Sequence, residues 1–402
     1  MKILHTADWH LGHRLHEQSQ FEEQSQFLNW LEVYIHDNQI DVLLISGDVF
    51  DTGVPSAQSQ TMYYNFLINL KKTSCQHVVI TGGNHDAPGT LNAPKGILHS
   101  LSIHVVGKAT ENIEEEVFVL SVKDEKVIIA AVPFLRDQDI RRAVAAESFE
   151  QIGNRYKMAL IKHYKEVAEY CKTLKTNTIP AIAMGHLFAI GGSTSESEQT
   201  IYVGNLGDIG AGDFPEVFDY VALGHLHRAQ KIDNLDRIRY SGSPYMLSFS
   251  EIEHKKKIIL LQTDNEKINS LEEIDVPLFR QIRRIRGSYE ECVTQLLALD
   301  TEEYELKPWV EVILNNEINT YFGFSEIHKA AEGLNLEVLK VTLKNERKIA
   351  GLEKLIQNAQ NVNELSPNKV FELKCREQHF DLDANPEILD AFNEVLQIAR
   401  EG

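Results

Sequence analysis

Carboxylate, amide and imidazole side chains follow five short apolar runs of this sequence, at positions where the chain would leave a buried strand. In an α/β sheet the carboxyl ends of the strands open into one crevice, so these side chains can converge there. They are Asp8 and His10 after the first run, Asp48 after the second, Asn84, His85 and Asp86 after the third, His186 after the fourth, and His225 and His227 after the fifth.

Seven of these side chains form a mixed oxygen and nitrogen ligand set without a thiolate: Asp8, His10, Asp48, Asn84, His186, His225 and His227. Such a set suits Mn²⁺, Fe or Zn²⁺ and disfavours Ca²⁺ or a structural thiolate zinc site. It exceeds what one ion normally needs. A bridging carboxylate can hold two ions ~3.5–4 Å apart, the arrangement that clamps the attacking and leaving oxygens in phosphoryl displacement. The glycines next to these residues would permit tight turns and let a phosphate approach the backbone.

Each motif alone also has a purely structural interpretation. An Asp-x-His sequence after a strand could be a turn, and Gly-Asn-His-Asp could be an Asx-turn. Isolated histidines such as His36, His163 and His328 are expected to be surface or packed residues, since the chain has 16 histidines. Recurrence of the pattern after five strands is what favours a shared site.

Residues 1 to about 270 alternate β-branched runs, polar or Gly-containing loops and amphipathic stretches, which predicts an α/β architecture with helices covering sheet faces. Helices are expected over 21–36, 56–72 and 149–174. Strands are expected over 2–6, 41–46, 77–81, 103–107, 117–122, 127–133, 181–184, 220–223, 237–240 and 257–262.

The pattern changes after this part of the chain. Residues 275–345 predict a small α+β module, with strands over 277–285, 309–314 and 336–344 and helices over 289–299 and 324–333. Residues 346–402 are expected to be helical, with Ser366 and Pro367 as an N-cap and first-turn pair. Three domains are therefore predicted: 1–270, 275–345 and 346–402.

Bulk properties limit the class of protein and its partners. The net charge of −19 argues by itself against nucleic-acid binding, although a local basic patch or bound cations can reverse the field where it matters. The cluster Arg280, Arg283, Arg284 and Arg286 could be such a patch, or simply the polar face of a strand. Four widely spaced cysteines are expected to be reduced and structural. With no export signal or spanning segment visible, a cytoplasmic location is expected.

The ordered motifs resemble those of the calcineurin-like metallophosphoesterases: Asp8-x-His10, Gly47-Asp48-x-x-Asp51, Gly83-Asn84-His85-Asp86, Gly185-His186 and Gly224-His225-x-His227. The phrases from His5 to Gly12, from Gly47 to Gly53, from Gly224 to His227 and from Tyr240 to Pro244 resemble more narrowly the nuclease subunits of bacterial double-strand-break repair complexes. The resemblance covers essentially the whole chain, and over the last 130 residues it is one of layout more than of motif. It implies a β-sandwich flanked by helices, a capping domain and a C-terminal helical segment.

The same resemblance implies roles for the candidate residues. One ion would be held by Asp8, His10, Asp48 and His227, and the other by Asp48, Asn84, His186 and His225, with Asp48 bridging. His85 would be the catalytic residue that is not a ligand, placed to protonate the leaving oxygen or to stabilise the transition state, and Asp86 would orient it. Archaeal relatives carry a histidine in place of Asp51, whereas the bacterial branch agrees with Asp, so the resemblance leaves open whether Asp51 makes the DNA contact assigned to that histidine.

The implied activity is that of a Mn²⁺-dependent DNA nuclease (Mg²⁺ is the other candidate ion), a double-strand 3′–5′ exonuclease and single-strand endonuclease. It would act in DNA repair, recombination and hairpin cleavage as a homodimer bound to an SMC-like ATPase. Residues 275–345 would help to hold DNA. The C-terminal helices would dock on the ATPase or, alternatively, fold back on their own domain. A small-molecule or protein phosphoesterase of the same fold, and a metal-free scaffold, are the competing hypotheses.

Overall fold

The structure of the chain is a computed structural model, which describes residues 1–136, 139, 149–176, 179–195, 197–198, 209–264, 267–299, 305–315, 320–344 and 392. The chain divides into two compact units. The first comprises Met1–Arg284, Ala298–Glu311 and Gly333–Lys340, and the second comprises Ile285–Leu297, Val312–Glu332 and Val341–Gly402. The helical segment predicted over 346–402, with its Ser366 and Pro367 cap, lies outside the described residues apart from Phe392.

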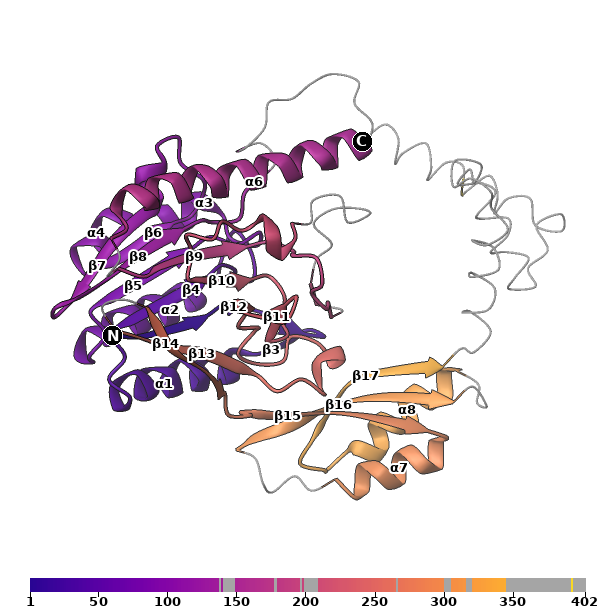
Figure 1. The fold of residues 1–402 in the computed structure, drawn as a ribbon. Helices are drawn as coiled ribbons and strands as arrows, with labels where there is room; N and C mark the ends of the chain where they lie inside the picture. Colours follow the sequence, from indigo (N-terminus) through magenta and orange to yellow (C-terminus); the bar gives the residue numbers. More distant parts are fainter. Residues whose placement is uncertain are drawn as a thin grey trace. The chain divides into compact units, whose positions relative to one another are not determined.

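The first of two six-stranded sheets contains the strands that precede the motifs of Asp8, Asp48 and Asn84 (Figure 1). Its four strands from β1 to β6 run parallel, while β13 is antiparallel to both of its neighbours. The order is β14 (Ile268–Asp275), β13 (Lys257–Thr263), β1 (Lys2–Thr6), β4 (Val42–Ser46), β5 (His77–Thr81) and β6 (Ile103–Val106).

The second six-stranded sheet contains the strands that lead to His186 and His225. Its inner strands are parallel, and an antiparallel strand closes each edge. The order is β11 (Gln230–Ile232), β12 (Leu235–Tyr240), β10 (Tyr220–Gly224), β9 (Ala181–His186), β8 (Glu125–Ala131) and β7 (Val117–Val122).

The two sheets pack face to face because their strands are apolar on both sides. In β4, Val42 and Leu44 join Ile182 and Ala222 of the second sheet in the core between the sheets. The alternate residues of β4 point the other way, toward the helices. A strand that is buried on both faces reads as a continuous apolar run, which is why these strands are visible in the sequence.

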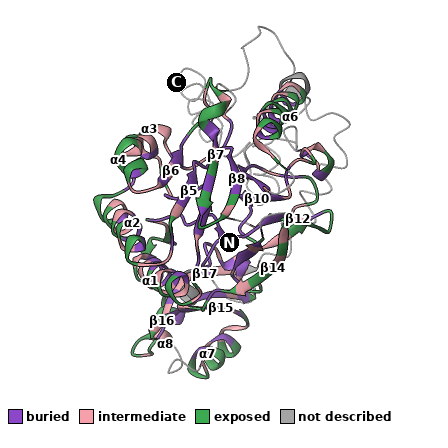
Figure 2. Ribbon diagram, turned by 60° about the vertical axis from the view of Figure 1, so that its left-hand side comes forward, coloured by how far each residue is buried: buried purple, intermediate pink, exposed green. Residues whose placement is uncertain are grey.

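Helices cover the outer face of each sheet, and their exposed sides face solvent (Figure 2). Ser56 caps α2 by accepting a hydrogen bond from the Ser59 N–H at 3.1 Å. The helices over the first sheet are α1 (Phe21–Asp37) and α2 (Ala57–Asn69), with α3 (Pro88–Asn92) and α4 (Lys95–Ser100) near β6, and α6 (Phe149–Leu174) covers the second sheet. The expected β-sandwich flanked by helices is confirmed.

The module predicted over 275–345 shows the expected alternation of strand and helix. Its strands form a three-stranded sheet in the order β15 (Arg280–Gly287), β16 (Leu306–Asn315) and β17 (Glu337–Lys344). The helices α7 (Tyr289–Leu297) and α8 (Thr320–Ala331) contact each other.

Several elements were not predicted from the sequence, among them the short helices α3 and α4 and the edge strand β11. A short hairpin of β2 (Arg14–Leu15) and β3 (Gln18–Ser19) follows the first motif. The edge strand β14 extends the first sheet to Asp275; it is half exposed and has no apolar alternation to reveal it. Among the described residues, no helix is both long enough and apolar enough to cross a bilayer. The described cysteines Cys75, Cys171 and Cys292 are buried free thiols.

Candidate metal centre

All seven predicted ligands lie together where the carboxyl ends of the two sheets' parallel strands meet. Strands β1, β4 and β5 are neighbours in the first sheet, β9 and β10 are neighbours in the second, and β4 contacts both β9 and β10. The loops after these strands are joined by hydrogen bonds, from the His10 N–H to the Asp48 carbonyl at 2.9 Å and from the His225 N–H to Asp8 Oδ1 at 2.9 Å. The site is therefore built across the two sheets rather than within one.

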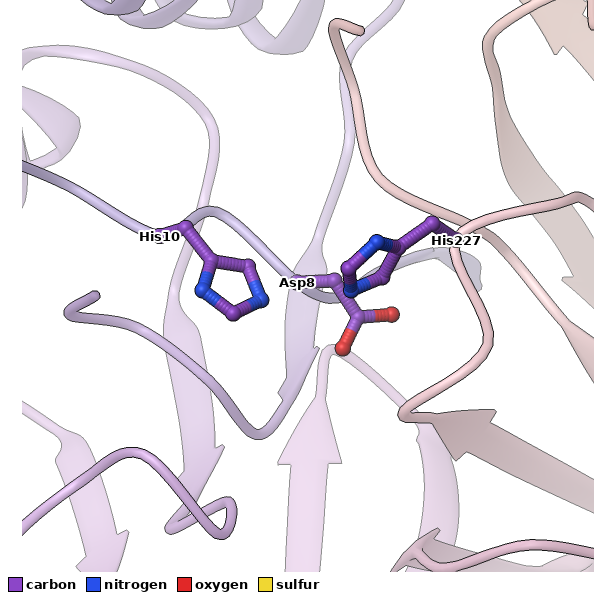
Figure 3. Close-up of side chains that lie close together, drawn as sticks. All are labelled: Asp8, His10 and His227. Atoms are coloured by element: carbon purple, nitrogen blue, oxygen red, sulfur yellow. The ribbon is translucent and has the colours of Figure 1, made fainter. Parts of the chain in front are cut away.

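Asp8, His10 and His227 form the first group of possible ligands (Figure 3). All three are buried, and one ligand atom from each lies within 4.8 Å of those of the other two. A ring nitrogen of His227 is directed toward the Asp8 carboxylate in Figure 3. Two of the atoms, Asp8 Oδ2 and His10 Nε2, are buried and have no hydrogen-bond partner. Buried polar atoms without a partner are rare in proteins, and a bound cation would satisfy both.

Asp48, His186 and His225 form the second group, within the same 4.8 Å limit. The Nδ1 of His186 lies 3.0 Å from the Ser46 carbonyl, which can only accept a hydrogen bond, so the neutral ring keeps its proton there. The lone pair of His186 Nε2 then faces Asn84 Oδ1 at 2.9 Å and Asp48 Oδ2 at 3.2 Å. His225 Nδ1 also approaches Asn84 Oδ1, at 3.2 Å. Convergence of these atoms on one point requires a positive charge between them, which a proton on His186 Nε2 supplies in the metal-free chain and a divalent ion would supply when bound.

Asp48 is shared between the two groups. Its Oδ2 lies 3.2 Å from His186 Nε2 and 3.5 Å from His10 Nε2, while its Oδ1 accepts the His85 N–H at 2.9 Å. This position between a histidine of each group is the one that a bridging carboxylate requires. The donor set as a whole fits two divalent ions.

The electrostatics show how strongly the site lacks positive charge. Burial raises the pKa of Asp8 to about 7, with a further increase from Asp48, although His186 and His227 oppose the shift. Burial by itself would lower the pKa of His186. The neighbouring Asp48 carboxylate outweighs burial, so that the pKa of His186 is raised to about 9. Burial lowers the pKa of His10 to about 4, so this ring is neutral at physiological pH, as a metal ligand must be.

The backbone of the site is held in conformations that most residues avoid. Asp8, His10, Asp48 and His225 all have positive φ, at 55°, 42°, 48° and 105°. Such conformations persist only where the surrounding structure imposes them, and they are common at functional sites. The loops therefore turn sharply at the ends of the strands and direct the ligands inward.

Gly83 is required by this close packing. A Cβ at this position would lie 2.1 Å from Asp48 Oδ1 and 2.3 Å from the Asp48 nitrogen. The glycines of the site were expected to let a phosphate approach the backbone. At Gly83 the structure shows a different reason, which is that the loop after β5 packs directly against the carboxylate and backbone of Asp48.

His85 and Asp86 differ in how well they match their predicted roles. The Nδ1 of His85 donates to the Asp51 carbonyl at 2.8 Å, and its ring lies 4.7 Å from that of His10, between centroids. The prediction that Asp86 orients His85 is wrong in this structure. The buried Asp86 carboxylate instead accepts the N–H groups of Val49, Phe50 and Gly83, at 2.9 to 3.1 Å, so it holds the loop that carries Asp48.

The structure also adds polar residues around the ligands that the motifs did not identify as part of the site. Asp51 Oδ1 lies 3.2 Å from His10 Nδ1 and 2.9 Å from His13 Nδ1, so its carboxylate supports the ring of a ligand. Glu251 lies 3.6 Å from His227 Nδ1. Asp51 belongs to a recognised motif and could have been suspected, whereas no spacing or motif singles out Glu251.

The four arginines near the start of the module are not equivalent. Arg280 is buried, pairs with Glu22 and Glu23, and lies over the ring of Trp309 at 4.2 Å. Arg284 pairs with Glu311. Arg283 and Arg286 are exposed on β15 and are the members of the cluster that remain accessible to a phosphate backbone.

Comparison with known proteins gives two family matches. Residues 1–229 match the calcineurin-like phosphoesterases, and residues 278–379 match a family described as the type 5 capsule protein repressor C-terminal domain. The chain is 32% identical to the SbcD subunit of the nuclease SbcCD of Escherichia coli K12, over 98% of both chains. It is 33% identical to the corresponding protein of Bacillus subtilis, over 65% of this chain and 66% of the relative. For the corresponding protein of Rhodobacter capsulatus the identity is 36%, over the same shares.

Proposed function

This chain belongs to the calcineurin-like phosphoesterases, among the SbcD nuclease subunits, and we propose that it cuts DNA with two Mn²⁺ ions held between its two sheets. The observation that carries the proposal is the convergence of the candidate ligand atoms on two adjacent points, with Asp48 between them and with Asp8 Oδ2 and His10 Nε2 lacking any hydrogen-bond partner. When bound, the ions would activate the attacking water and neutralise charge on the phosphodiester.

Two of the groups of neighbouring side chains support a division of the ligands between the two ions. Asp8, His10 and His227 would hold one ion, and His186, His225 and Asn84 the other, with Asp48 shared. Because the histidines of both groups are buried and rings in each group are fixed by hydrogen bonds to groups outside the site, the ligand geometry exists before an ion arrives.

His85 would deliver a proton to the leaving oxygen. Its hydrogen bond to the Asp51 carbonyl fixes the ring and leaves Nε2 for the substrate. Asp86 would act indirectly, by holding the Asp48 loop through three backbone N–H groups.

The names of the relatives place them in a complex called SbcCD, and we extend this to the present chain. Its partners would be DNA and an SMC-like ATPase, in an assembly containing two copies of the chain. Residues 1–270 would form the nuclease domain, residues 275–345 a capping domain that holds DNA, and residues 346–402 the helical segment that docks on the ATPase. Exposed Arg283 and Arg286 support the assignment of the capping domain.

The test is cleavage of linear double-stranded DNA in Mn²⁺, with and without the partner ATPase and ATP, and with His85→Ala as the control. Cleavage that requires Mn²⁺ and His85, and that the ATPase stimulates or redirects, is the expected result. Turnover of a small nitrophenyl phosphodiester with no cleavage of DNA under any condition would instead assign a small-molecule substrate to the same site.

A further inference from the structure

Glu251 is a buried carboxylate that no step of the proposed reaction uses. It ends the short 3₁₀ helix Phe249–Glu251, its side chain is 0% exposed, and it forms an ion pair with the buried Lys256. It also accepts hydrogen bonds from the Leu247 N–H at 3.3 Å and the Ser243 hydroxyl at 3.5 Å. Burial of an ion pair costs several kcal/mol in desolvation for each ion, so its presence calls for an explanation beyond stability.

The carboxylate reaches a proposed metal ligand through one hydroxyl group. Ser197 Oγ lies 2.7 Å from His227 Nδ1 and forms a short hydrogen bond with Glu251 Oε1. Glu251 Oε1 itself lies 3.6 Å from the same ring nitrogen. Because an ionised carboxylate can only accept, the Ser197 hydroxyl donates to Glu251 and must accept from His227 Nδ1–H.

The backbone of His227 is held by the same group of residues. Its N–H donates to Glu198 Oε1 at 2.8 Å, and its carbonyl accepts from Lys256 Nζ at 3.2 Å and from the Ser243 N–H at 3.1 Å. Lys256 thus contacts both Glu251 and the backbone of His227. Ring and backbone are fixed together, which leaves little freedom in the position of Nε2.

We propose that Glu251, acting through Ser197, is a positioning residue that fixes the ring of His227 with its proton on Nδ1 and its Nε2 lone pair toward the ion shared with Asp8 and His10. The inference rests on the proposed two-ion function and deepens it. A carboxylate that accepts from the distal nitrogen of a histidine ligand orients the ring and makes it a stronger ligand.

Glu251 should act on one ion of the two. The ring of His186, in the other group, is fixed by a different acceptor, the Ser46 carbonyl at 3.0 Å from its Nδ1. Loss of Glu251 should therefore weaken the ion at Asp8, His10 and His227, and leave the ion at His186 and His225 in place.

The experiment is titration of the metal-free full-length chain with Mn²⁺ by calorimetry, for the wild type and for Glu251→Gln. We expect the wild type to bind two ions, and Glu251→Gln to bind one of them about 10–100-fold more weakly. His227→Ala serves as the reference that identifies which ion is affected. Nuclease activity of Glu251→Gln should require more Mn²⁺ but recover the wild-type kcat at saturation, a split that general destabilisation would not produce.

A matched control exists in Glu116, which is also 0% exposed and also pairs with a buried histidine, His163, at 2.8 Å, away from the metal centre. Glu116→Gln removes the same charge from the same kind of pair and should leave both Mn²⁺ affinities within about twofold of the wild type. Equal loss of Mn²⁺ affinity in Glu116→Gln and Glu251→Gln would overturn the inference, because it would reduce the effect to stability.

Glu251→Gln leaves Lys256 buried without its counter-charge, so a second variant guards against misfolding. Ser197→Ala keeps the ion pair of Glu251 and Lys256 and removes the hydroxyl between Glu251 and His227, together with its contact to Ser195 Oγ at 2.7 Å, and it should weaken the same ion by a smaller factor. If the wild type binds two ions and both variants bind them with unchanged constants, the inference is overturned while the proposed function stands. If the wild type binds no Mn²⁺, the proposed function itself is overturned.

Discussion

At the level of single residues, alanine substitutions of His85 and Asp48 are expected to have different effects on metal binding and activity. We assign His85 a role at the leaving oxygen and not as a ligand, so His85→Ala should retain both ions and lose about 10²–10⁴-fold in kcat. Asp48 lies between the two ligand groups, so Asp48→Ala should lose both ions together with activity. Metal content after gel filtration and single-turnover cleavage would measure the two effects. Retained cleavage by His85→Ala would remove its assigned role.

Gly83 provides a second test at the same scale. A methyl group there would overlap Asp48, so Gly83→Ala should destabilise the fold by about 1–3 kcal/mol and reduce Mn²⁺ affinity. Gly89→Ala is the matched control, since a Cβ at Gly89 meets no atom within 4 Å. Urea unfolding and Mn²⁺ titration of both variants would be compared. Equal stability and equal Mn²⁺ affinity of the two variants would mean that the loop after β5 moves aside freely.

At the level of elements, the helix α6 is tied to the 3₁₀ helix Ile113–Glu116 by the buried pair of Glu116 and His163. Glu116 also accepts from the Thr110 N–H at 2.7 Å. Glu116→Gln should therefore lower the free energy of unfolding by about 1–3 kcal/mol. Glu169→Gln, in an exposed pair with Lys172 on the same helix, should change it by less than about 0.5 kcal/mol. Urea unfolding would give the free energy of unfolding of both variants. A similar decrease in Glu116→Gln and Glu169→Gln would contradict the role of the buried pair.

The thiols of Cys75 and Cys171 are predicted to be unreactive in the folded chain. Burial raises the pKa of each to about 12, and a thiol is protonated below its pKa. At pH 8 only about 10⁻⁴ of each thiol would be thiolate, the form that reacts. Iodoacetamide labelling followed by mass spectrometry should modify both cysteines only after unfolding. Rapid modification of either in the native protein would contradict their burial.

At the level of the whole molecule, the net charge of −19 makes long-range attraction of DNA unfavourable, so local positive charge must act at short range. Arg283 and Arg286 are exposed, whereas Arg280 and Arg284 are engaged in ion pairs. The double variant Arg283→Ala, Arg286→Ala should bind DNA more weakly, without a change in kcat. The slope of log K against log salt should become less steep by about 1.8 if both arginines contact phosphates.

The control for this prediction is Lys162→Ala, which removes an exposed cation with 75% side-chain exposure from α6. Fluorescence anisotropy with labelled duplex DNA at several salt concentrations would give the slope of log K against log salt for the double variant and for Lys162→Ala. A double variant with the slope of the wild type would show that β15 does not contact the DNA backbone.

The sequence by itself determined the strands that are buried on both faces and the set of candidate ligands. Strands such as β1 and β4 are buried on both faces and therefore appear as continuous apolar runs, and each is followed at once by its polar residues. Edge strand β14 lacks that pattern because solvent meets one side of it, so nothing local distinguishes it from a loop.

Only the tertiary structure decided how the ligands are supported. Asp86 and Asp51 are both acidic residues of recognised motifs, yet Asp86 binds backbone N–H groups while Asp51 contacts His10 and His85. Glu251 stands 24 residues after His227 and reaches it through Ser197, which belongs to a separate loop. Ligands follow their strands in sequence because the strand ends place them. Residues that orient the ligands come from any segment that folding brings into contact, so their positions depend on how the two sheets pack.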